Sequence, residues 1–146
     1  MREPILAENL APYSALSSTH DTINGLCDAL EAVADSLPGN VDRQSCRCLS
    51  QTLIPLLERA QQREERQVFP TLRLRSAPAS AFERLKNEHF EDLCVAEEAS
   101  EVLARLARDE EVNKEAAGYL LRGLFTMLRR HIAFESQFVS GLKPPQ

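Results

Sequence analysis

Four long segments in which apolar residues recur every three or four positions limit the fold of this chain more than any other feature. Such spacing is typical of an amphipathic helix that turns one face to a core. It predicts helices over residues 13–37, 42–67, 80–108 and 112–140. Because 146 residues fit one domain, we expect residues 1–146 to form a single all-α unit, an antiparallel up-down-up-down four-helix bundle.

Prolines and capping residues predict where these helices begin and end. Residues 1–12 contain two prolines and are expected to form an extended lead-in. Pro55 lies inside the second helix, where we expect a kink or a local break, and Pro70 closes that helix. Ser80 and Glu83 have the spacing of a capping box, which predicts the start of the third helix.

The composition argues against several classes of partner. A net charge of −5 with interspersed signs disfavours nucleic acid or an anionic membrane as the main partner. We expect no membrane span, because no run of about 18 apolar residues occurs. The N-terminus lacks the apolar region of a secretory signal. The four cysteines are expected to be free thiols in a reducing compartment, so we expect a cytoplasmic protein.

Each of the three histidines lies on the apolar stripe of a different predicted helix: His20, His89 and His131. Two carboxylates, Glu64 and Glu135, also fall on inward stripes, and Glu135 lies one helical turn after His131. Taken singly, each residue is more often a hydrogen-bonded core histidine or an exposed charge. Their joint occurrence favours a metal site, because buried titratable groups need partners and His and Glu are ligands of divalent transition metals.

The positions of the five residues along their helices are compatible with one common level in an antiparallel bundle. That level lies toward the end that holds both termini and the connection between the second and third helices. Glu65 is expected to point about 100° away from Glu64 and to be solvated, given the helical period. The sequence therefore predicts one layer of inward-facing imidazoles and carboxylates.

These elements resemble the hemerythrin-like family, the cation-binding four-helix bundles often called HHE domains. The matching pieces are His20-Asp21, the run Arg63-Glu64-Glu65-Arg66-Gln67-Val68-Phe69-Pro70, Glu88-His89, and His131-x-x-x-Glu135 with Phe138. The resemblance implies a non-haem di-iron centre in which two Glu bridge the metals. The ligands it implies are His20, Glu64, His89, His131 and Glu135.

The chain departs from this family pattern at Ala60, which stands where the pattern has a histidine four residues before Glu64. Three outcomes are open: an asymmetric di-iron centre with solvent at the gap, a mononuclear iron site, or no metal. We favour a metal site, because five inward polar groups need partners.

By resemblance, the chain is expected to bind or sense dioxygen, nitric oxide or peroxide, or to handle iron. A binding or sensor protein is expected rather than an enzyme, although the resemblance also permits a di-iron oxidase or peroxidase. The alternative is a degenerate, metal-free bundle that acts as a protein-interaction or regulatory module. A homodimer or another protein partner is compatible with either hypothesis.

Overall fold

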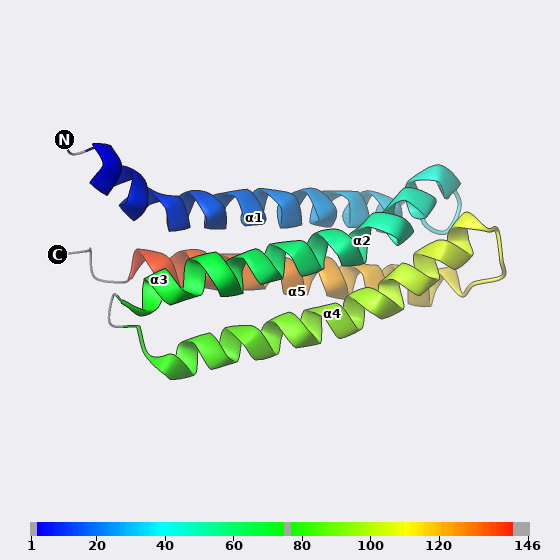
Figure 1. Ribbon diagram of the computed structural model, residues 1–146. Coiled ribbons are helices and arrows are strands. Elements are labelled where there is room, and N and C mark those ends of the chain that lie inside the picture. The colour runs from blue at the N-terminus through cyan, green and yellow to red at the C-terminus, as the bar shows by residue number, and fades with distance from the viewer. Residues whose placement is uncertain (1–2, 75–76, 142–146) are drawn as a thin grey trace.

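The protein is an antiparallel bundle of four long helices in the computed structural model, which describes residues 3–74 and 77–141, with side chains from residue 14 onward (Figure 1). The long helices are α1 (Glu3–Ser36), α2 (Arg43–Arg63), α4 (Ala79–Ala107) and α5 (Lys114–Ser140). Two short elements follow α2, the π-helical turn η1 (Glu64–Val68) and α3 (Phe69–Arg73). The described ranges contain no strand, so the predicted all-α class is confirmed.

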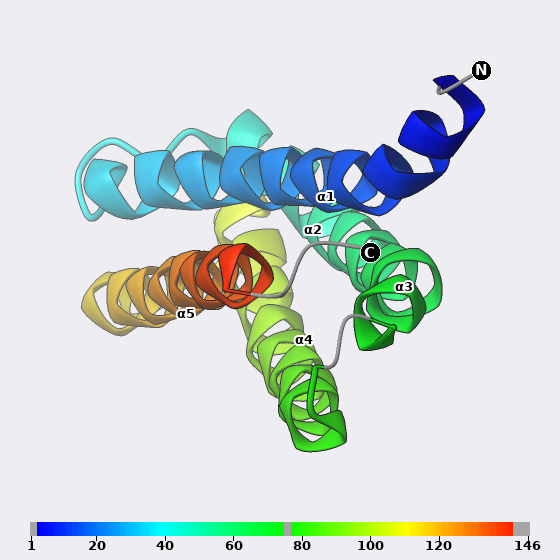
Figure 2. The ribbon, with the colours of Figure 1, turned by 90° about the vertical axis from the view of Figure 1, so that its left-hand side faces the viewer.

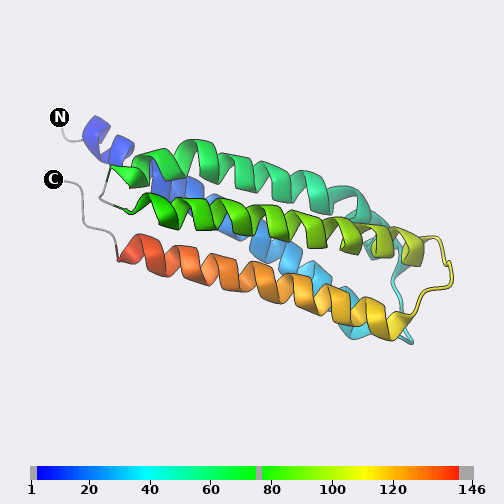
Figure 3. The ribbon, with the colours of Figure 1, turned by 90° about the horizontal axis from the view of Figure 1, so that it is seen from below.

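The first turns of α1 and the last turns of α5 lie at the same end of the bundle, which we call the terminal end (Figure 1 and Figure 3). Figure 3 shows that the end of α3 and the start of α4 lie there too. The helices therefore run up, down, up and down, as predicted, with α1 beside α2 and α5. None of the described helices has an apolar stretch long enough to cross a membrane.

The first helix starts earlier than predicted. Because α1 begins at Glu3, the expected extended lead-in is wrong for residues 3–12, while residues 1 and 2 lie outside the described part. Pro4 falls in the first turn, where its missing N–H costs nothing. Pro12 lies inside α1 and has no backbone N–H to donate to the preceding turn. Figure 2 shows the first turns of α1 bent away from the rest of that helix.

The irregularity in the second helix also differs from the prediction. The helix α2 runs through Pro55 without interruption, because Pro55 is exposed and water can reach the carbonyl that it leaves free. The break comes instead at η1, where the backbone N–H of Phe69 bonds to the carbonyl of Glu64, five residues earlier. Pro70 falls in the first turn of α3 and does not end the helical path.

The later helices begin close to their predicted positions, but the predicted capping box is wrong. The helix α4 starts at Ala79 after Pro78, with no side-chain cap, so Ser80 already lies inside the helix. Asn113 caps α5 through its side-chain oxygen, which accepts from the backbone N–H of Ala116 at 3.0 Å.

The core consists of two hydrophobic clusters at different heights. The larger cluster occupies the far half of the bundle and includes Leu30, Leu53, Leu103 and Leu124, all 0 % exposed. The smaller cluster lies toward the terminal end and contains Ala15, Leu16, Val68, Phe69, Leu72, Phe82 and Leu85. Along each long helix, the buried polar residues lie between the members of these two clusters. The bundle thus holds a polar layer between two apolar ones.

Candidate metal centre

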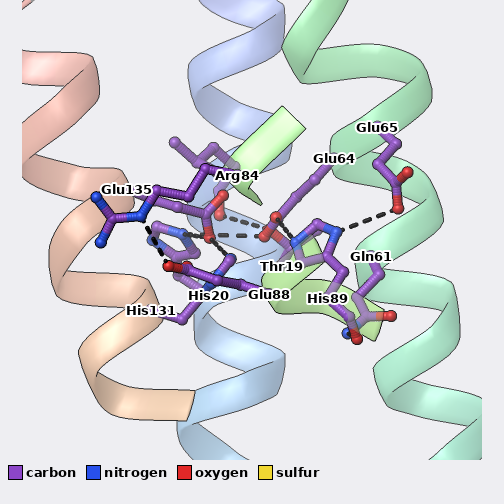
Figure 4. A network of polar contacts seen from close by, with 11 residues as sticks. Thr19, His20, Gln61, Glu64, Glu65, Arg84, Glu88, His89, His131 and Glu135 are labelled. Carbon is purple, nitrogen blue, oxygen red and sulfur yellow. Dashed lines mark hydrogen bonds and ion pairs between the residues drawn. The ribbon is translucent and has the colours of Figure 1, made fainter. Parts of the chain in front are cut away.

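The structure brings the five predicted site residues into this polar layer (Figure 4). Four of them, from η1, α4 and α5, each offer one ligand atom, and these atoms all lie within 4.8 Å of one another: Glu64, His89, His131 and Glu135. All four side chains are buried, and Glu64 is 0 % exposed. On α4 and α5 the regular helical period produces this convergence, because His89, His131 and Glu135 continue the apolar stripes of their helices.

Each imidazole of the four-residue group faces a carboxylate with its Nε2 atom. His89 Nε2 lies 3.0 Å from Glu64 Oε2, and His131 Nε2 lies 3.0 Å from Glu135 Oε1. The centroids of the two rings are 4.8 Å apart. The two nitrogens and the two carboxylates therefore point toward a common centre from three elements.

The Nε2 atom of His131 is buried and forms no hydrogen bond within the described residues. Although Glu135 Oε1 is only 3.0 Å away, the angles between the two groups do not suit a hydrogen bond. A buried polar atom without a partner is rare in proteins. A cation placed between the imidazole and the carboxylates would satisfy this nitrogen, so the donor set fits a divalent metal.

His20 approaches the same carboxylates from α1. Its Nε2 atom lies 3.3 Å from Glu135 Oε1 and 4.0 Å from Glu64 Oε1. It is therefore next to the group of four but outside the set of mutually close atoms. The site is asymmetric, with two imidazoles on the side of α4 and α5 and one on the side of α1.

Two outer carboxylates contact the far nitrogens of the imidazoles. Glu65 Oε2 lies 3.1 Å from His89 Nδ1, and Glu88 Oε2 lies 2.9 Å from His131 Nδ1. Arg84 donates to the other oxygen of Glu88 at 3.1 Å (Figure 4). Such contacts fix which nitrogen of a metal-binding histidine faces inward. The expectation that Glu65 is simply solvated is wrong, because the π-helical turn places its half-buried carboxylate beside His89.

Two neutral side chains, one from α1 and one from α2, form hydrogen bonds with residues of the layer. The hydroxyl of Thr19 lies 3.1 Å from Glu64 Oε1 and 2.8 Å from the carbonyl oxygen of Leu16. The side-chain amide of Gln61 donates to the backbone carbonyl of His89 at 2.9 Å. These bonds connect α1 and α2 to the residues that face the centre.

Burial and mutual contacts shift the protonation of the group. Burial raises the pKa of Glu64 to about 7. Burial lowers the pKa of His131, but the neighbouring carboxylate of Glu135 outweighs it and raises that pKa to about 9. Burial alone would raise the pKa of Glu135, but its contacts with His131 and His20 outweigh burial and hold that pKa well below the usual range. In the metal-free protein these groups therefore share protons, which a bound cation would displace.

Ala60 leaves open space beside the site. Its side chain is buried, at 5 % exposure, and borders a pocket of about 110 Å³ between α1 and α2. Thr19, which contacts Glu64, lines the same pocket, and the guanidinium of Arg63 at its rim donates to the hydroxyl of Ser18 at 3.0 Å. The asymmetry of the donor set therefore coincides with a small hollow on the α1 and α2 side.

No role was predicted from the sequence for four polar residues around the centre: Thr19, Gln61, Glu88 and Asp92. Glu88 could have been found as the residue before His89, because a metal-binding imidazole commonly needs an outer carboxylate. Asp92 is buried at 4 % exposure, and burial raises its pKa to about 6. Its position three residues after His89, on a neighbouring part of the same helical face, was the available signal.

The cysteines lie outside the site. All four are free thiols, as predicted, and Cys46 is buried while Cys48 is exposed. Cys27 packs in the larger hydrophobic cluster, with its sulfur 3.8 Å from the carbonyl oxygen of Phe125. Cys27 therefore acts as a small apolar residue of the core.

Comparison with models of known protein families assigns residues 11–139 to the hemerythrin HHE cation binding domain. No match was found among curated proteins or among solved structures. The family match covers most of the chain and includes every residue of the polar layer, from Thr19 to Glu135. The chain therefore belongs to the hemerythrin HHE cation-binding domain family.

Proposed function

We propose that the chain is a non-haem iron-binding protein that holds its metal with Glu64, His89, His131 and Glu135, with His20 completing the α1 side. The observation that carries this proposal is the buried Nε2 of His131, which has no hydrogen-bond partner among the residues that the structure describes and faces three other donor groups within 4.8 Å. Imidazole and carboxylate donors suit iron, which in turn supplies redox and small-molecule binding chemistry when bound.

The chain's own residues set the character of the centre. The two carboxylates offset the charge of the cation, and the outer contacts of Glu65 and Glu88 orient the imidazoles. Phe69 stacks on His89 with ring centroids 5.8 Å apart, so it limits the access of water from the terminal end. We propose that this layer binds or senses dioxygen, nitric oxide or peroxide, or handles iron, since fewer donors on the α1 side leave room for a small molecule.

A metal-free regulatory bundle is the second candidate function. Two observations favour it: Ala60 replaces a donor of the family pattern, and the buried groups already pair with one another, as in the contact between His89 and Glu64. In that case the polar layer is a hydrogen-bond network that fixes the alignment of the helices, and the activity lies in binding a protein partner.

Metal content distinguishes the two candidates. The full chain is purified metal-free, incubated with ferrous iron without oxygen, desalted and assayed for iron per chain. We expect at least one tightly bound ion, and we expect His131→Ala to lose it while Thr126→Ala, on the exposed face of α5, retains it. Iron retention by the wild-type chain that His131→Ala does not reduce would reject the ligand assignment, and no retention at all would favour the metal-free function.

A further inference from the structure

A cleft of about 370 Å³ lies between α4 and α5, on the outer side of His131. These two helices pack less extensively against each other than the other neighbouring long helices do. The polar side chains that line the cleft are Arg84, Glu88, Glu91, Asp92, Arg130 and His131. The cleft thus reaches from the surface to the imidazole that faces the candidate centre.

Asp92 is the unusual member of this lining. It is only 4 % exposed, and no hydrogen bond or ion pair joins its carboxylate to another residue in the described part of the chain. Its oxygens are not among the fully buried atoms that lack a partner, so the solvent of the cleft reaches them and they are open to a cation. The imidazoles of both His131 and His89 lie close enough to act on its charge. Asp92 therefore lies between the cleft and the candidate centre.

The two arginines of the cleft do not neutralise Asp92. Arg84 donates to Glu88, and its guanidinium lies over the ring of Phe134 at 4.7 Å from the centroid. Arg130 is exposed and forms no ion pair with a described residue. Glu88 is also fully engaged, because one of its oxygens accepts from Arg84 and the other contacts His131. Among the carboxylates of the cleft, Asp92 and the exposed Glu91 are free for a cation.

We propose that the α4–α5 cleft is the route by which a divalent cation reaches the centre, with Glu91 at its mouth and Asp92 as a transient ligand. Carboxylate oxygens suit a partly hydrated divalent ion, and because Arg84 is paired with Glu88, the carboxylates of Glu91 and Asp92 outweigh the one unpaired arginine of the lining, Arg130. This inference rests on the proposed function, because a loading route requires a centre that retains the metal. It adds a role for residues outside the ligand group.

The test measures the rate at which the metal-free full chain takes up ferrous iron under anaerobic conditions, by quenching samples with a chromophoric chelator. We expect Asp92→Asn to slow uptake by about tenfold, the lower range of electrostatic focusing, with the final iron content unchanged. Glu98→Gln, an exposed change on the same helix outside the cleft, is the control and should load like the wild type.

A second variant guards against a folding defect in Asp92→Asn. Arg130 is exposed, so Arg130→Gln should fold normally, and removing its positive charge should accelerate uptake by about fourfold, as expected of one charge roughly 10 Å from a divalent ion in water. Uptake at the wild-type rate in both variants overturns the route, as does a lower final iron content in Asp92→Asn, which would make Asp92 a resident ligand. If the wild-type chain retains no iron, the proposed function itself fails.

Discussion

The outer carboxylate of Glu88 offers a sharp test of how the site orients its ligands. Its Oε2 atom lies 2.9 Å from His131 Nδ1, while Arg84 donates to its other oxygen at 3.1 Å. In Glu88→Gln, the amide oxygen would turn to Arg84, since a guanidinium can only donate. The amide NH₂ would then face the Nδ1–H of His131, so two donors would meet. We therefore expect a loss of metal affinity at the upper part of the range for such outer contacts.

The magnitude follows from that range, which is about 10- to 100-fold, or roughly 1.4–2.7 kcal/mol. Glu65→Gln is the matched comparison, because Glu65 makes the equivalent contact with His89 at 3.1 Å and has no other hydrogen bond within the described residues. Its amide can rotate to accept from the imidazole, so we expect a loss nearer to tenfold. Anaerobic titration of ferrous iron against a chromophoric chelator measures both values.

The exposed Glu83 of α4 provides the control for charge alone, and Glu83→Gln should bind iron like the wild type. If Glu88→Gln and Glu83→Gln bind iron equally well, His131 does not depend on Glu88 for its orientation. If Glu65→Gln loses more affinity for iron than Glu88→Gln, then the contact with Arg84 does not fix the orientation of the substituted amide.

Three further predictions concern the gap, the thiols and the acidity of the layer. Ala60→His should raise the iron content of reconstituted protein toward a di-iron stoichiometry, whereas Ala60→Leu, which fills the pocket without a donor, should not. Iodoacetamide should modify the exposed Cys48 quickly, and Cys27 only on unfolding, because burial raises the pKa of Cys27 to about 11; mass spectrometry of digests reports both. Since the pKa of Glu64 rises from 4.5 to about 7 on folding, its contribution to stability is present below pH 4.5 and is lost as the pH rises through 7. Thermal melts of the metal-free chain should show this loss, and Glu64→Gln should reduce it.

The helical stripes predicted the fold and most of the polar layer. Because apolar spacing of three and four residues gives one buried face per helix, the same pattern located the core and the imidazoles within it, as with Leu85 and His89 on α4. Individual positions shifted by one residue where two apolar residues are adjacent. Leu57 is buried while its neighbour Leu56 is only half-buried, and the spacing alone does not choose between the two.

The remaining features depend on tertiary contacts that a periodic pattern does not contain. The π-helical turn at η1 adds a residue to one turn, which brings Glu65 within 3.1 Å of His89 Nδ1, and nothing in the local sequence requires it. The role of Glu88 depends on the height of α4 relative to α5. The helical start at Glu3 was missed because a proline in the first turn is compatible with a helix, and the interior Pro12 was given too much weight.

The location of the bound metal tests the central claim most directly. Crystals of the full chain loaded with ferrous iron can be measured on both sides of the iron absorption edge, so that anomalous scattering locates each ion. We predict a peak enclosed by Glu64, His89, His131 and Glu135, with any second, weaker peak toward His20. Iron-loaded crystals with no anomalous peak in the polar layer, or with peaks only at the surface, would contradict the assignment of this layer as a metal centre.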